Sequence, residues 1–136
     1  MCGISGYRRL RADGAFPERA VLERMTGALA HRGPDGDGFF HDPAAGIALG
    51  HRRLSIIDVA GGRQPIAGAD GRSQIVLNGE IYNYRELRQE LAGRGHAFRT
   101  QSDTEVILRG YEAWGLDVLR RLNGIFAFAI WDAAAR

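Results

Sequence analysis

The chain has 136 residues, of which 45% are hydrophobic and 25% charged, and this composition is typical of a single ordinary globular domain. All eighteen basic residues are arginine, but sixteen acidic residues are interspersed with them, so the net charge of +2 argues against a nucleic-acid partner. The longest apolar run, residues 125–131, is far shorter than the roughly 20 residues of a membrane-spanning helix, and no signal-peptide pattern opens the chain, so we expect a cytoplasmic protein without a membrane partner.

The N-terminal part of the chain is predicted to form a strand, a helix and a loop in turn. Residues 2–7 have the pattern of a short strand, and Pro17 opens a helix whose apolar residues recur at helical spacing. This helix is expected to end by Gly33. The segment HRGPDGDG at residues 31–38 contains three glycines and a proline, so we expect an irregular loop there.

The middle of the chain is predicted to consist of short strands. Glycine, proline and aspartate separate the apolar segments, which is the pattern of strands joined by turns. The expected strands are residues 39–40, 47–49, 54–57 and 74–77. The last of them ends at Asn78-Gly79, a pair that is typical of a tight hairpin turn.

Two more helices and an apolar strand complete the predicted elements. Residues 84–91 carry apolar side chains at helical spacing before Gly93 and Gly95. Residues 102–105, with the sequence SDTE, have the form of a capping box and open a third helical pattern that continues to Gly124. Residues 125–131 then predict a strand that is buried on both faces. Because the strands come in adjacent pairs, we expect an α+β fold in which helices cover antiparallel sheets.

Cys2 is the single cysteine of the chain and directly follows Met1. Removal of Met1 would leave the thiol beside its own α-amino group, which titrates at about 7.7 to 8.0 in unfolded chains. That amine can act as a base at neutral pH, and the thiol can then act as a nucleophile. The alternative is that Cys2 is a small apolar residue that opens a strand.

Two polar motifs in the middle of the chain are candidates for substrate contacts. The amide of Asn78 and the N–H of Gly79 can point together at a developing oxyanion, and a turn at this position is compatible with that role. In the segment HRRLSI, strand alternation places Arg52 and Arg53 on opposite faces. An inward Arg53 needs a partner, which a substrate carboxylate would provide. The alternatives are an internal ion pair with Asp58 or Glu80, or exposure to solvent at the strand end.

Two acidic residues complete a possible recognition set for a free amino acid. Taken alone, Glu80 is a surface carboxylate after a turn, and Asp103 is an acid in the first turn of a helix. Together they can bind an α-ammonium group, with Arg53 on the carboxylate and the Cys2 thiol at the reacting atom. The four histidines lack the spacing of a zinc site, so we expect no metal in this part of the protein.

The motifs, taken together, resemble the class II glutamine amidotransferases, and most closely the glutamine-hydrolysing asparagine synthetases. The segments that carry the resemblance are MCGI at 1–4, HRGPDGDG at 31–38, HRRLSIID at 51–58, NGEIYNY at 78–84, SDTEVIL at 102–108 and GIFAFAIWD at 124–132. The resemblance implies an N-terminal nucleophile hydrolase fold, which is a four-layer αββα sandwich of antiparallel sheets. It also implies that Cys2 is the nucleophile and, through its α-amine, the base.

The same resemblance implies roles for the other candidate residues. Asn78 and Gly79 would form the oxyanion hole, Arg53 would bind the α-carboxylate of glutamine, and Glu80 and Asp103 would hold its α-ammonium group. The implied reaction hydrolyses the side-chain amide of L-glutamine through a Cys2 thioester and needs no cofactor.

In that family the ammonia passes to a synthetase domain of the same chain, which uses ATP and Mg²⁺ to convert aspartate to asparagine. We expect residues 1–136 to be an incomplete glutaminase domain without this synthetase domain, and a homodimer stays open. The alternatives are a glutaminase domain of another amidotransferase, or a non-catalytic glutamine-binding fragment.

Overall fold

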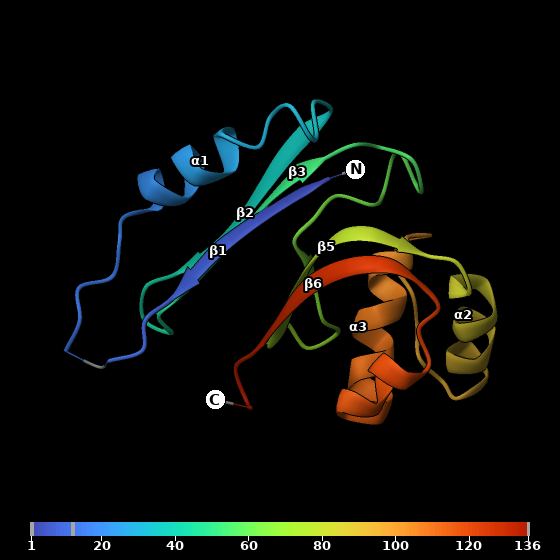
Figure 1. The fold of residues 1–136 in the computed structure, drawn as a ribbon. Helices are drawn as coiled ribbons and strands as arrows, with labels where there is room; N and C mark the ends of the chain where they lie inside the picture. The colour runs from blue at the N-terminus through green and yellow to red at the C-terminus, as the bar shows by residue number, and fades with distance from the viewer. Residues whose placement is uncertain (1, 12, 136) are drawn as a thin grey trace.

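The computed structural model describes residues 2–11 and 13–135, which form two antiparallel sheets stacked face to face (Figure 1). The first sheet has the order β1-β3-β2 and the second has the order β4-β5-β6. The strands of the first sheet are β1 (Gly3–Arg8), β2 (Gly36–Asp42) and β3 (Ile47–Arg53). Those of the second are β4 (Ile66–Ala67), β5 (Ser73–Ile81) and β6 (Gly124–Asp132).

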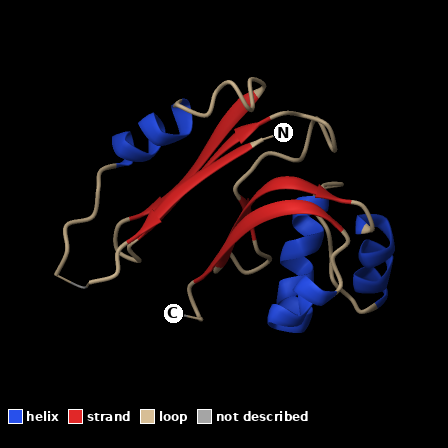
Figure 2. Ribbon diagram, viewed as in Figure 1, coloured by secondary structure: helices blue, strands red, loops and turns tan. Residues whose placement is uncertain are grey.

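Helices cover the outer face of each sheet. The helix α1 (Arg19–Gly27) lies on the first sheet, and α3 (Asp103–Trp114) packs on β5 of the second, with α2 (Tyr84–Gly93) beside it. A 3₁₀ helix, η1 (Gly115–Arg120), follows α3. The order of layers is therefore helix, sheet, sheet, helix (Figure 2). This arrangement confirms the predicted α+β sandwich of antiparallel sheets.

The core has two parts, which lie on opposite faces of the second sheet. Ile75, Leu77 and Ile81 of β5 pack with the helices, whereas Val76 packs with Ile47 and Leu49 of β3 between the sheets. Side chains alternate along a strand, so every second residue of β5 faces the same layer. By this alternation Asn78 and Glu80 lie on the face that is directed at the first sheet.

Asn78-Gly79 lies inside β5, so the predicted hairpin turn is wrong. Asn78 pairs with Ala127, and Gly79 pairs with Phe126 of β6, a strand that is distant in the sequence. The glycine is required here for a different reason. Its φ is +153°, and a Cβ atom would lie 2.3 Å from the carbonyl oxygen of Ile125. The backbone of β6 thus approaches too closely for any side chain at this position.

Other segments also differ from the sequence prediction. Regular pairing begins at Gly36, so the second half of the expected 31–38 loop belongs to β2. Residues 54–57 are not a strand, because the chain leaves the first sheet after Arg53. The third helix is α-helical only to Trp114, since Gly115 has a φ of +59° and the chain continues as η1.

The start of β6 is more exposed than its apolar sequence predicted. Ile125 is 65% exposed, whereas Trp131 near the other end of the strand is buried between the sheets. The strand is at the edge of its sheet, and Phe126 and Phe128 pack on the helical side, whereas Ile125 and Ala127 on the other face are exposed. The prediction that this strand is buried on both faces is therefore wrong at this end.

Ser102 is the N-cap of α3, as the SDTE segment predicted, but the reciprocal bond of a capping box is replaced, since the Ser102 N–H donates to Thr100 Oγ1 and not to Glu105. Ser102 Oγ accepts a hydrogen bond from the Thr104 N–H at 3.1 Å. The Glu105 carboxylate reaches further back and accepts from the N–H groups of Arg99 and Thr100. Glu105 also pairs with Arg109 at 3.0 Å, and both side chains are almost fully buried. This carboxylate therefore joins the segment before α3 to the helix itself.

We predict that Glu105→Ala lowers the free energy of unfolding by about 3 to 5 kcal/mol, because it leaves buried donors and part of a buried charge without a partner. Urea unfolding measures this loss. Glu23→Ala is the matched control, since it removes an i,i+4 ion pair with Arg19 in which both side chains are exposed. That change should cost less than about 1 kcal/mol. Equal losses in the two variants would contradict the prediction.

Candidate active site

A cavity of about 140 Å³ lies where the end of the first sheet meets the second sheet and the start of α3. Its walls come from the first residue before β1, the chain after β3, the end of β5 and the N-terminus of α3. The predicted site residues that line it are Cys2, Arg53, Gly79, Glu80 and Asp103. Asn78, the other predicted residue, is adjacent but does not line the cavity.

The Cys2 thiol is held by the chain that follows β3. The N–H of Leu54 donates to Sγ at 3.3 Å, and the thiol lies 3.6 Å from the carbonyl oxygen of Leu54. Arg32 Nε donates to the carbonyl oxygen of Cys2 at 3.1 Å. The start of β1, which directly follows Cys2, lies beside the end of β3, where Gly3 pairs with Arg52 (Figure 1). Met1, whose predicted removal would free the α-amine, lies outside the described residues.

Arg53 faces the cavity and organises the loop after β3. Its Nη1 donates to the carbonyl oxygen of Val59 at 2.9 Å, and its Nη2 donates to those of Asp58 at 2.6 Å and Ile57 at 3.3 Å. Arg53 thus binds the backbone carbonyl of Asp58 and does not form the alternative ion pair with its carboxylate. The Asp58 carboxylate instead accepts from the N–H groups of Gly61 and Gln101.

Arg52, the neighbouring arginine, is directed away from the cavity. Its Nε donates to the carbonyl oxygen of Gly33 at 2.9 Å, and its Nη1 contacts Asp37 at 3.3 Å. The two arginines thus serve different parts of the structure, as strand alternation requires.

Leu77 on β5 has both of its backbone polar groups bonded to side chains. Its N–H donates to Gln64 Oε1 at 2.6 Å, and its carbonyl oxygen lies 3.1 Å from His51 Nε2. A carbonyl can only accept, so His51 carries its proton on Nε2. Both groups of Leu77 therefore point away from β6, toward the cavity side of the strand.

The N–H of Gly79 points to the same side as that of Leu77, because backbone groups alternate in direction along a strand. Ile81 follows the same alternation, and its N–H donates to Asp103 Oδ2 at 3.0 Å. Gly79 lies between these two fixed positions and lines the cavity. Its N–H is therefore a donor directed at the cavity wall.

Asn78 is directed at the first sheet, which also carries Cys2. Its Oδ1 atom is buried and, among the residues that the structure describes, has no hydrogen-bond partner. Buried polar atoms without partners are uncommon and are typical of functional sites. The Asn78 amide thus lies next to the cavity, and its oxygen accepts no hydrogen bond from the described residues.

The two predicted acids differ in environment. Asp103 is 5% exposed and accepts hydrogen bonds from the N–H groups of Ile81 and Thr104. Burial raises the pKa of Asp103, and the nearby charge of Glu80 acts in the same direction. Glu80 is exposed at the mouth of the cavity. A bound cation would stabilise both carboxylates in their ionised form.

The sequence prediction missed two residues that contact the site. Arg32 belongs to the expected 31–38 loop and no pattern there marks it, although it binds the backbone of Cys2. Gln64 is a single glutamine before Pro65 and has no distinctive pattern either. Its Nε2 donates to Thr104 Oγ1 at 3.0 Å, next to Asp103.

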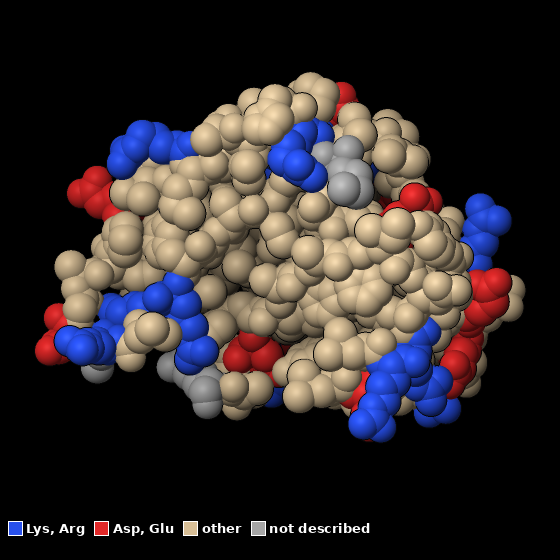
Figure 3. Space-filling view, in the orientation of Figure 1, with Lys and Arg blue, Asp and Glu red and all other residues tan. Residues whose placement is uncertain are grey.

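Figure 3 shows how the charged side chains are distributed over one face of the molecule. Arginine side chains lie in separate groups around the periphery of this face, interspersed with acidic ones. In the described part of the chain, no group of histidine, cysteine, aspartate and glutamate residues could hold a metal ion. None of the described helices has the length and hydropathy to cross a bilayer.

Comparison with protein families matches the whole chain, residues 1–136, to a family described as "Glutamine amidotransferase domain". The chain is 44% identical to asparagine synthetase [glutamine-hydrolyzing] 1 of Bacillus subtilis (strain 168), over 97% of its own length and 21% of that relative. It is 42% identical to asparagine synthetase [glutamine-hydrolyzing] 1 of Arabidopsis thaliana, over 97% of the chain and 22% of the relative. The chain thus spans about a fifth of the length of these relatives.

The fold also resembles a solved structure, the glutamine phosphoribosylpyrophosphate amidotransferase of B. subtilis in complex with ADP and GMP. The TM-score is 0.64 at 21% identity, and the match covers 97% of this chain and 35% of that one. This likeness supports the sandwich of antiparallel sheets and helices that the sequence predicted.

We predict that His51 makes the stability of this region depend on pH. Burial lowers its pKa to about 4, whereas a histidine in an unfolded chain titrates near 6.5. The unfolded chain therefore binds the proton first, so this contribution is present above pH 6.5 and is lost as the pH falls toward 4. The full loss is about 3 kcal/mol.

Urea unfolding between pH 7 and pH 4 measures this dependence. His51→Gln should flatten the change in unfolding free energy over this range, whereas His31→Gln, at an exposed position, should leave it as in the wild type. The same slope in His51→Gln and wild type would show that His51 is not the titrating group.

Proposed function

Because this chain belongs to the glutamine amidotransferase domain family, we propose that it hydrolyses the side-chain amide of L-glutamine to glutamate and ammonia. One observation carries the proposal: the thiol of Cys2, the N–H edge at Gly79, the arginine Arg53 and the buried acid Asp103 all line one cavity. The thiol and the N–H suit the side-chain amide of glutamine, Arg53 suits its α-carboxylate, and Asp103 suits its α-ammonium group.

In the proposed first step, the Cys2 sulfur attacks the amide carbon of glutamine. After removal of Met1, the α-amine of Cys2 takes the thiol proton and returns it to the departing nitrogen. The carbonyl oxygen becomes an oxyanion, which the N–H of Gly79 and the side-chain amide of Asn78 stabilise. Ammonia leaves and a thioester remains, which water then hydrolyses to glutamate and the free thiol.

The charged groups of the cavity would orient the substrate. Not all N–H donors of the Arg53 guanidinium are used by the loop carbonyls, so donors remain for the α-carboxylate. Asp103 and Glu80 would hold the α-ammonium group, and the ammonium charge would offset the cost of keeping Asp103 ionised in a buried position.

We further propose that the full-length protein uses the ammonia to make asparagine from aspartate. The support is the similarity to curated asparagine synthetases, which are about five times as long as this chain. In this proposal ATP and Mg²⁺ would act in a synthetase domain outside these residues. We place this reaction in the cytoplasm. The likeness to the phosphoribosylpyrophosphate amidotransferase is weaker in sequence and supports only the shared fold.

The proposed glutaminase domain extends beyond the 136 residues. The exposed start of β6, at the edge of its sheet, is where we expect further chain to pack.

We predict that Cys2→Ala abolishes glutamate release from glutamine, because the reaction loses its nucleophile. In the full-length protein, synthesis that is supplied with free ammonia should continue. The assay measures glutamate with glutamine as substrate, and an intact-mass measurement shows whether Met1 has been removed. Hydrolysis by Cys2→Ala at a near wild-type rate would refute the assignment.

We predict that Arg53→Ala lowers kcat/KM for glutamine by about 2 to 4 kcal/mol in activation free energy, chiefly through KM, because a charged contact to the substrate is lost. Arg52→Ala is the control, since Arg52 binds Gly33 and Asp37 instead. Because Arg53 also holds the 57–59 loop, Tm is measured in both variants. A loss in Arg52→Ala equal to that in Arg53→Ala would contradict the role.

A further inference from the structure

The side chain of Gln64 connects the two elements that carry the candidate site. Its Oε1 accepts the N–H of Leu77 on β5 at 2.6 Å, and its Nε2 donates to Thr104 Oγ1 on α3 at 3.0 Å. Leu77 directly precedes Asn78-Gly79, and Thr104 directly follows Asp103. One amide group therefore contacts the backbone beside the oxyanion donors and the helix that carries the buried acid.

Gln64 takes the place of a strand that is missing at this edge of β5. The short strand β4 pairs with β5 only at Gln74 and Ile75. Beyond that point the N–H and carbonyl of Leu77 need other partners, since unpaired buried backbone groups are costly. Gln64 binds the N–H, and the fully buried His51 binds the carbonyl from the other sheet. Both backbone groups of Leu77 are thus fixed by side chains.

We propose that Gln64 is a positioning residue that fixes the direction of the Gly79 N–H by holding Leu77 in place. This role rests on the proposed glutamine hydrolysis. Gly79 lies two residues after Leu77 on the same edge of β5. On the far side of Gly79, Ile81 fixes the edge through its hydrogen bond to Asp103. Donors to an oxyanion must lie within a few tenths of an ångström of their best position, so a shift of this edge weakens their effect.

The test compares wild-type protein with Gln64→Met, which keeps the length of the side chain and removes both hydrogen bonds. We expect kcat for glutamine hydrolysis to fall by about tenfold to a hundredfold, while KM changes less than about twofold. Alkylation of Cys2 by iodoacetamide should keep its wild-type rate, because displacement of iodide forms no oxyanion.

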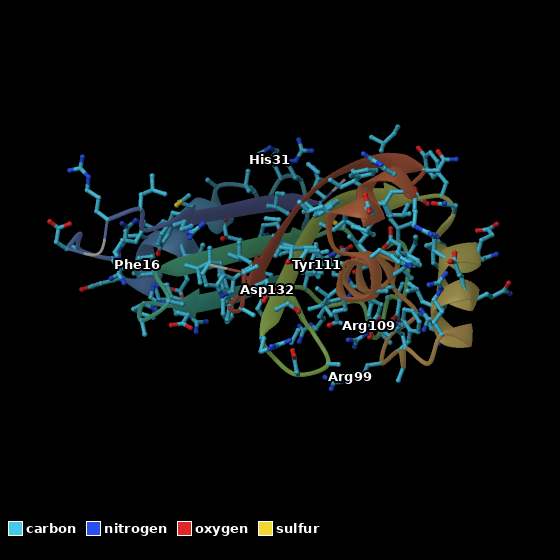
Figure 4. All side chains as sticks on the ribbon, turned by 90° about the horizontal axis from the view of Figure 1, so that it is seen from below. Phe16, His31, Arg99, Arg109, Tyr111 and Asp132 are labelled. Carbon is cyan, nitrogen blue, oxygen red and sulfur yellow. The ribbon has the colours of Figure 1, made fainter. Side chains whose placement is uncertain are left out.

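Thr104→Val is a milder second variant, because it removes only the bond that orients the Gln64 amide. It should lower kcat in the same direction by a smaller factor, and it keeps the test decisive if Gln64→Met does not fold. Tyr111→Phe is the matched control. It removes a hydrogen bond of 3.1 Å from α3 to Asp132 at the other end of β6 (Figure 4). It should alter Tm without altering kcat.

The outcomes separate this role from the reaction on which it rests. Wild-type protein that releases no glutamate would overturn the proposed hydrolysis and this role with it. Active wild-type protein together with unchanged kcat in folded Gln64→Met or Thr104→Val would overturn the role alone. A variant in which kcat falls and Cys2 is also alkylated faster than in the wild type would show that Gln64 supports the fold in general. That result would also overturn the positioning role.

Discussion

The structure depends on how the edge of β5 is satisfied where β4 ends. A strand edge in a protein interior exposes N–H and carbonyl groups that must find partners, and here the partners are side chains from three other segments. Gln64, His51 and Asp103 bind this edge at Leu77 and Ile81. Because the edge is completed by side chains and not by a further strand, the N–H of Gly79 between them remains available to the cavity.

Charged side chains near the cavity are likewise hydrogen-bonded to backbone groups. Arg53 is largely buried, and its guanidinium binds three carbonyls of the 57–59 loop. Glu105 and Arg109 are buried as a pair, and Glu105 also binds the backbone before α3. Arg53 and Glu105 thus each stabilise a segment of irregular backbone. The segment that Arg53 binds also lines the cavity, through Ile57.

Membership in the glutamine amidotransferase family and the geometry of the cavity support the same chemistry by independent routes. The family match rests on sequence across the whole chain. The cavity brings together a thiol, a directed backbone donor, an arginine and two acids, which is the set that a free amino acid with a reactive amide requires.

The sequence by itself determined the features that depend on local patterns. Helical periodicity located α2, and the SDTE segment located the cap of α3, because caps and amphipathic faces involve residues close in the chain. The sequence also singled out Cys2 as the one thiol, together with the residues whose catalytic roles stay predictions. The tertiary structure decided the rest. Asn78-Gly79 reads locally as a turn, but its partner is the distant strand β6, and Gln64 acquires its contacts only when β5 and α3 come together. Such pairings depend on packing between remote segments, and no local pattern encodes them.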